Sequence, residues 1–85
     1  MSESIKQKVV ALRDSKVGTF GSICLVKTIS VGERMFFDLI KDKSTLIGQH
    51  PEDFSLWCVG DFDEDTGIIT PACFEVCCGT KQQEA

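Results

Sequence analysis

The side chains most able to do chemistry form an acidic cluster in the second half of the chain. Residues 60–67 read GDFDEDTG, with three aspartates at alternating positions and a closing glycine. An EF-hand calcium loop requires oxygen ligands at positions one, three and five, a glycine at six and a glutamate at twelve. Counted from Asp61, position six is Thr66 and position twelve is Ala72. We therefore predict no metal site in this segment.

The acidic segment is better explained as the tip of a β-hairpin. Apolar runs flank it at 54–59 and 68–69, which is the pattern of two strands joined by a short polar loop. Gly67 has the position of a left-handed turn residue, where the absence of a Cβ removes a steric cost. The spacing predicts a rigid turn that ends at Gly67.

Histidine and cysteine give little support for catalysis or metal binding. The single histidine, His50, precedes Pro51, and the adjacent Glu52 and Asp53 suit a turn as well as a proton relay. Five cysteines lack CxxC spacing, which favours reduced thiols buried as small apolar residues. They are Cys24, Cys58, Cys73, Cys77 and Cys78. Because phosphate-binding loops, GxSxG and HExxH are also absent, we expect a protein without a cofactor that is not an enzyme.

The composition bounds the size and location of the protein. A chain of 85 residues makes one domain with a small core, which we place at 1–80, followed by a flexible tail at 81–85. The net charge of −4 combines +3 over residues 1–43 with −7 over residues 44–85. No apolar run approaches a membrane span or a signal peptide. We expect a soluble protein that makes no membrane contact.

Hydrophobic patterning predicts an α+β fold of order β-β-α-β-β. Strands are expected at 5–14, 22–29, 54–62 and 68–78, with Pro71 marking an edge or a break in the last. The helix should begin at a capping box formed by Ser30 and Glu33 and end near Lys43. The result is a mainly antiparallel four-stranded sheet with one helix packed on one face.

The third strand has two faces of different character. Strict alternation puts Phe54, Leu56, Cys58 and Phe62 beneath the helix. It puts Ser55, Trp57, Val59 and Asp61 on the other face. Because one helix cannot cover both faces, Trp57 and Val59 are candidates for an oligomer interface, with a homodimer favoured.

Single-stranded DNA is a candidate ligand of the same sheet. Such binding requires cations for the phosphates and aromatic side chains for the bases. The candidate DNA-binding residues are Lys6, Lys8, Arg13, Lys16, Lys27 and Trp57. Two alternatives stay open: the lysines protect an edge strand from aggregation, and the tryptophan packs in a subunit interface. A sequence pI near 4.8 opposes the usual basic footprint.

The order of three motifs resembles one phage family. RDSKVGTF at 13–20 precedes HPEDFSLW and VG-FD-x-x-TG-x-I within 32–69. This combination resembles the small nonstructural protein of gokushovirus-type Microviridae, which are single-stranded DNA bacteriophages. The resemblance covers most of the chain, but not the N-terminal residues or ACFEVCCGTKQQEA.

This resemblance implies a function within the infected cell. The protein is expected to associate with phage DNA during single-strand genome synthesis and packaging, in the host bacterial cytoplasm and not in the mature virion. The resemblance does not indicate which residues would contact DNA. The alternative is a non-enzymatic oligomeric module that binds a phage capsid or replication protein without contacting DNA.

Overall fold

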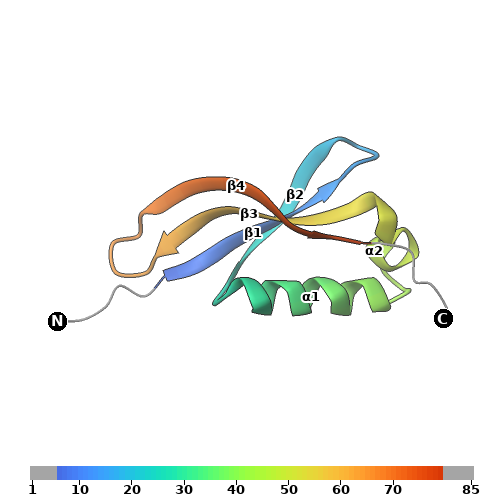
Figure 1. Cartoon of the computed structure of the whole chain (residues 1–85), viewed down its shortest axis with the longest axis horizontal. Helices are drawn as coiled ribbons and strands as arrows, with labels where there is room; N and C mark the ends of the chain where they lie inside the picture. Colours follow the sequence, from blue (N-terminus) through green and yellow to red (C-terminus); the bar gives the residue numbers. More distant parts are fainter. Residues whose placement is uncertain (1–5, 80–85) are drawn as a thin grey trace.

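Two antiparallel hairpins form the sheet of this chain, and one long helix covers one side of it (Figure 1). The computed structural model describes residues 6–79, so the predicted tail at 81–85 lies outside the described residues. The strands run in the order β2-β1-β3-β4, with every neighbouring pair antiparallel. The elements are β1 (Lys6–Asp14), β2 (Thr19–Val26), α1 (Ile29–Lys41), α2 (Leu46–Gln49), a 3-10 turn (Pro51–Asp53), β3 (Phe54–Asp63) and β4 (Ile69–Cys78). The predicted α+β fold is confirmed.

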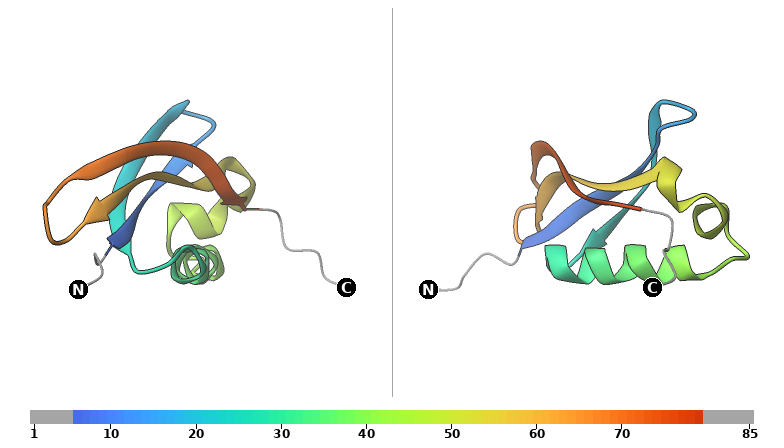
Figure 2. Two further views of the ribbon diagram at one scale, coloured as in Figure 1. Left: turned by 60° about the vertical axis from the view of Figure 1, so that its left-hand side comes forward. Right: turned by 45° about the vertical axis from the view of Figure 1, so that its right-hand side comes forward.

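The core lies between α1 and the sheet, which curves over the helix (Figure 2). Gly32, Phe36 and Ile40, spaced four residues apart, form the buried stripe of α1. They face sheet residues that include Val26 and the fully buried Leu56. A Cβ on Gly32 would lie 3.4 Å from Val26 Cγ2, which is ordinary van der Waals contact, so the helix and sheet leave room for a methyl group here. Each fully buried aliphatic side chain contributes about 1.5–3 kcal/mol relative to an exposed one.

The start of α1 differs from the prediction. The helix begins at Ile29 and is capped by Thr28, whose Oγ1 accepts a hydrogen bond from the Val31 amide at 3.2 Å. The predicted capping box at Ser30 and Glu33 is therefore wrong. Thr28 has the extended backbone of a cap, with φ −141° and ψ 163°, whereas Ser30 already lies in the first turn of the helix.

The second strand lies earlier than predicted, and a short helix was missed. β2 covers Thr19–Val26 in place of 22–29, because the helix takes up the last predicted strand residues. Ser22, with φ +35°, is an extra residue opposite β1 and forms a β-bulge. After α1, Thr45 caps the single turn of α2 by accepting a hydrogen bond from the Gly48 amide at 3.0 Å.

A second bulge at Val59 changes the alternation along β3. Consecutive residues of β1 pair with Cys58 and Gly60, so Val59 is left without a partner in that pairing. The extra residue reverses the faces beyond it. Asp61 therefore lies on the helix side and Phe62 on the opposite side, which is the reverse of the prediction.

The acidic segment forms the predicted hairpin turn between β3 and β4. Gly67 has φ +77°, and its amide donates to the Asp63 carbonyl at 2.7 Å. Asp63 also accepts the Asp65 amide through its side chain at 2.9 Å. The Asp63 carboxylate therefore stabilises the turn.

The predicted burial of the cysteines holds only in part. Cys58 is buried, Cys24 and Cys77 are half-buried, and Cys73 and Cys78 are exposed. The prediction is wrong for the last two because β4 is an edge strand and the helix leaves its outer residues uncovered. Neither helix within residues 6–79 has the length and apolar character needed to cross a membrane.

Candidate functional site

The face of the sheet opposite α1 is the first candidate site, and we call it the open face. Cross-strand register places two adjacent rows of side chains on it. The rows are Phe20–Arg13–Ser55–Cys78 and Ile23–Ala11–Trp57–Glu75. No helix among residues 6–79 covers this face (Figure 2). Ala11 is nevertheless only 1% exposed, because the larger side chains beside it cover its small one.

Arg13, Phe20 and Trp57 form a connected cluster on the open face. The rings of Phe20 and Trp57 meet edge to face, with centroids 5.4 Å apart and an interplanar angle of 83°. The Arg13 guanidinium carbon lies 5.5 Å from the Phe20 centroid, a cation–π distance. The indole Nε1 of Trp57 donates to Ser55 Oγ at 2.8 Å. These contacts hold two aromatic rings and one cation in fixed relative positions.

Among the six candidate DNA-binding residues, the structure brings Arg13 and Trp57 together through Phe20, which the sequence offers only as a possible second platform for bases beside Trp57. The signal for Phe20 was its place directly after the hairpin turn, in register with Arg13. At the same place, Glu75 lies opposite Trp57 in the pairing with β4. The cluster therefore has one cation and one nearby carboxylate.

The four candidate lysines lie elsewhere. Lys8 lies on the helix side, where its Nζ forms an ion pair with Asp61 at 2.7 Å, and this hydrogen bond raises the pKa of the Lys8 ammonium group. Lys6 lies on the same side at the exposed start of β1. Lys16 is in the turn between β1 and β2, and Lys27 follows the other end of β2. The lysines do not line a common groove with the aromatic cluster.

The two residues predicted for an oligomer interface lie in different settings. Trp57 is a half-buried member of the aromatic cluster, and Val59 is the half-buried bulge residue of β3. Both residues belong to β3, which is one of the two central strands of the sheet. The structure contains one chain, so their role in an interface stays a prediction.

A group of possible metal ligands lies outside the acidic hairpin. His50, Glu52 and Asp53 place one ligand atom each within 4.8 Å of one another, the only such group found within residues 6–79. All three come from the 3-10 turn or its flank, and two of them are exposed. Nothing else at this turn points to an ion, and we assign it no function.

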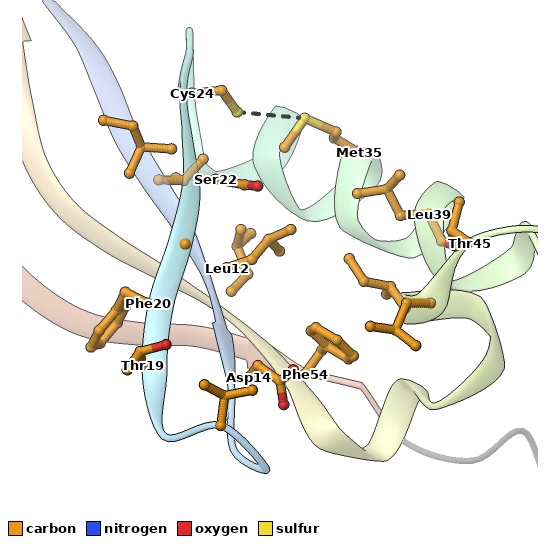
Figure 3. Close-up of a pocket in the computed structure, with 17 residues that line it drawn as sticks. Leu12, Asp14, Thr19, Phe20, Ser22, Cys24, Met35, Leu39, Thr45 and Phe54 are labelled. Atoms are coloured by element: carbon orange, nitrogen blue, oxygen red, sulfur yellow. Dashed lines mark hydrogen bonds between the residues drawn. The ribbon is translucent and has the colours of Figure 1, made fainter.

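A second candidate site is an apolar pocket between the β1–β2 hairpin, α1 and α2 (Figure 3). It has a volume of about 610 Å³, and Leu12 lies near its centre. Met35, Leu39 and Phe54 surround it, with the Cys24 Sγ 3.8 Å from the Met35 Sδ. One signal in the sequence points to this pocket, because Met35 and Leu39 widen the apolar stripe of α1 beyond its buried residues.

A neighbouring depression of about 870 Å³ continues the pocket along the outer side of α1. Met35 and Leu39 line both spaces, and Leu25 and Val31 line the second. We call the two spaces together the β2–α1 groove. It is bounded by the edge strand on one side and the helix on the other.

Comparison with known families gave one match. The sequence model of a family described as Phage ORF5 protein matches residues 7–82, which includes all but the first residue of the described part of the chain. No curated protein and no solved structure matches the chain.

Proposed function

The chain belongs to the family described as Phage ORF5 protein, and from this premise we propose that it binds single-stranded DNA through the open face. The family establishes a phage protein. The proposal adds a nonstructural, non-enzymatic role in single-strand genome synthesis and packaging, as in gokushovirus-type Microviridae. It places this role in the host bacterial cytoplasm, outside the mature virion.

The observation that carries the proposal is the Arg13–Phe20–Trp57 cluster on an uncovered four-stranded sheet. Several proteins bind single strands on such a sheet, because splayed bases stack on aromatic rings that the strands hold in place. Phe20 is 44% exposed, and the edge-to-face contact with Trp57 fixes the two rings at different angles. Arg13 can stack on a base or contact a phosphate beside the same ring.

Charge determines what kind of binding this face can support. One cation beside the aromatic pair and a glutamate opposite Trp57 give little phosphate attraction. Stacking contributes about 1–3 kcal/mol per base without sequence preference. We therefore propose weak, sequence-tolerant binding that is dominated by stacking and does not depend on a basic groove.

The β2–α1 groove favours the second candidate function, a non-enzymatic oligomeric module that binds a phage capsid or replication protein without contacting DNA, because its apolar walls suit contact between protein chains, whether copies of this chain or another protein. Contiguous apolar surface of this extent marks interaction sites on small proteins. Exposed Leu46, at 60%, adds to the apolar wall of the groove.

Fluorescence anisotropy of a labelled oligothymidine tests the DNA proposal. Phe20→Leu and Trp57→Leu should each weaken binding by about 5- to 150-fold, the loss expected for one stacked base. Phe37→Leu is the matched control, because Phe37 on α1 is 42% exposed against 44% for Phe20. This control should bind like the unchanged protein.

Three results would reject the open face as the DNA site. One is the absence of binding by the unchanged protein at high micromolar concentration. Another is equal loss for Phe20→Leu and Phe37→Leu. The third is binding that survives Trp57→Leu unchanged in a variant whose circular dichroism shows the native fold. If binding to DNA is absent altogether, the protein-binding module becomes the better explanation.

A further inference from the structure

The two edges of the sheet differ in how they are protected from pairing with another strand. An exposed edge presents free backbone donors and acceptors, and natural proteins usually block it with charges, prolines or bulges. The β4 edge has Pro71, Glu75 and two irregularities in its pairing. β2, with the sequence TFGSICLV, has no charged residue and no proline.

The unprotected β2 edge is also strongly apolar. Ile23 is 68% exposed and Leu25 is 46% exposed. Their pairing with Ala11 and Val9 puts both side chains on the open face, and both residues border the β2–α1 groove at the edge of the sheet. The bulge at Ser22 bends the strand before these residues. The segment from Ile23 to Val26 therefore remains as a regular, neutral stretch of edge strand.

Charged side chains are arranged with opposite signs at the two ends of the groove. Lys27 and Arg34 lie near the start of α1, whereas Asp38 and Asp42 lie towards its end, and all four line the same depression. Within residues 6–79 none of the four forms a salt bridge. An antiparallel copy of this surface would place the basic end of one helix against the acidic end of the other.

We propose that a second copy of this chain covers the β2–α1 groove, through antiparallel pairing of the two β2 strands about a two-fold axis. The strands exchange backbone hydrogen bonds, and Val31, Met35 and Leu39 of the two copies fill the groove between the helices. A neutral strand suits this symmetry, because the residue on the axis meets its own copy, where a charge would meet a like charge.

This dimer leaves Trp57 uncovered, since the contact lies at the sheet edge and on the side of α1. A two-fold axis perpendicular to the sheet keeps both open faces on the same side of one continuous sheet. If the open face binds DNA as proposed above, one strand can contact two aromatic clusters, with the gain in affinity expected for linked sites. That consequence depends on the proposed function, but the dimer does not.

Sedimentation velocity without DNA, over about 1 to 100 µM protein, tests the dimer by mass action. Ile23→Lys should raise the dimer Kd by about 100-fold or more, because the two-fold axis brings two charges into an apolar contact. Ile69→Lys is the matched control on the opposite edge, where the isoleucine is 57% exposed. The control should dimerise like the unchanged chain.

Charge reversal tests the orientation of the two copies. Arg34→Asp and Asp38→Arg should each weaken the dimer by about tenfold through like-charge contact. The double variant Arg34→Asp/Asp38→Arg should restore it, because complementarity is recovered with the signs exchanged.

A chain that stays monomeric over the whole concentration range would overturn the proposal, as would a dimer disrupted by Ile69→Lys and not by Ile23→Lys. Failure of the double reversal to restore an otherwise folded variant would reject the antiparallel geometry. Loss of DNA binding by Trp57→Leu with an unchanged dimer Kd separates the two proposals, because that variant alters only the open face.

Discussion

The salt dependence of DNA binding follows from the number of cations on the open face. For single strands, the logarithm of the binding constant falls with the logarithm of salt concentration with a slope of about −0.7 per phosphate contact. Arg13 is the one cation in the aromatic cluster, so raising salt from 50 to 200 mM should weaken binding only about threefold. A dimer that engages two clusters should lose about sevenfold. If all five candidate cations contacted phosphate, the loss would be about 100-fold.

An anisotropy titration at four salt concentrations measures this slope directly. Arg13→Gln should flatten it further, because the remaining contacts are stacked and uncharged. Lys27→Gln is the control, since this lysine follows the end of β2 that is far from the cluster. A slope steeper than about −2, or flattening by Lys27→Gln, would refute stacking-dominated binding on the open face.

Three further predictions concern stability and thiol reactivity. Gly48→Ala should destabilise the fold by about 1–3 kcal/mol, because the new Cβ would stand 2.0 Å from the Asp42 carbonyl oxygen. Gly32→Ala, with contacts of 3.4 Å or longer, should leave the free energy of unfolding unchanged or raise it by up to about 1 kcal/mol. Urea unfolding measures both variants. Gly67→Ala should cost about 1 kcal/mol or more and lower the melting temperature, since φ is +77°; unchanged melting would remove the argument from backbone strain. Burial, with a smaller effect of Glu33, raises the pKa of Cys77 to about 11, so its thiolate forms only as the pH rises towards that value. At pH 8, mass spectrometry should find maleimide on the exposed cysteines, Cys73 and Cys78, before it finds maleimide on Cys77. The reverse order of labelling would contradict this.

An element could be predicted from the sequence where its residues allow only one local conformation. It could not be predicted where two local conformations are possible and tertiary packing selects one of them. The turn ending at Gly67 was predictable because it requires a residue with positive φ, and glycine adopts that conformation at least cost. The start of α1 was not, since Thr28 and Ser30 are both good caps. The tertiary structure selects Thr28, because β2 ends at Val26 and only Lys27 and Thr28 connect it to the helix. α2 was missed because Gly48 usually ends regular structure, whereas here its lack of a Cβ permits contact with the end of α1.

The candidate site depended on a feature that no single strand encodes. The bulge at Val59 arises only when β3 pairs with its neighbours, and it moves Asp61 from the open face to the helix side. There Asp61 binds Lys8, so the bulge removes a repulsive carboxylate from the open face and pairs it with a predicted DNA contact on the helix side. The acidic total charge therefore says little about this face, whose local balance is set by Arg13 and Glu75. Because the charges of Arg13 and Glu75 nearly cancel, the affinity of this face for DNA is expected to come from stacking on Phe20 and Trp57.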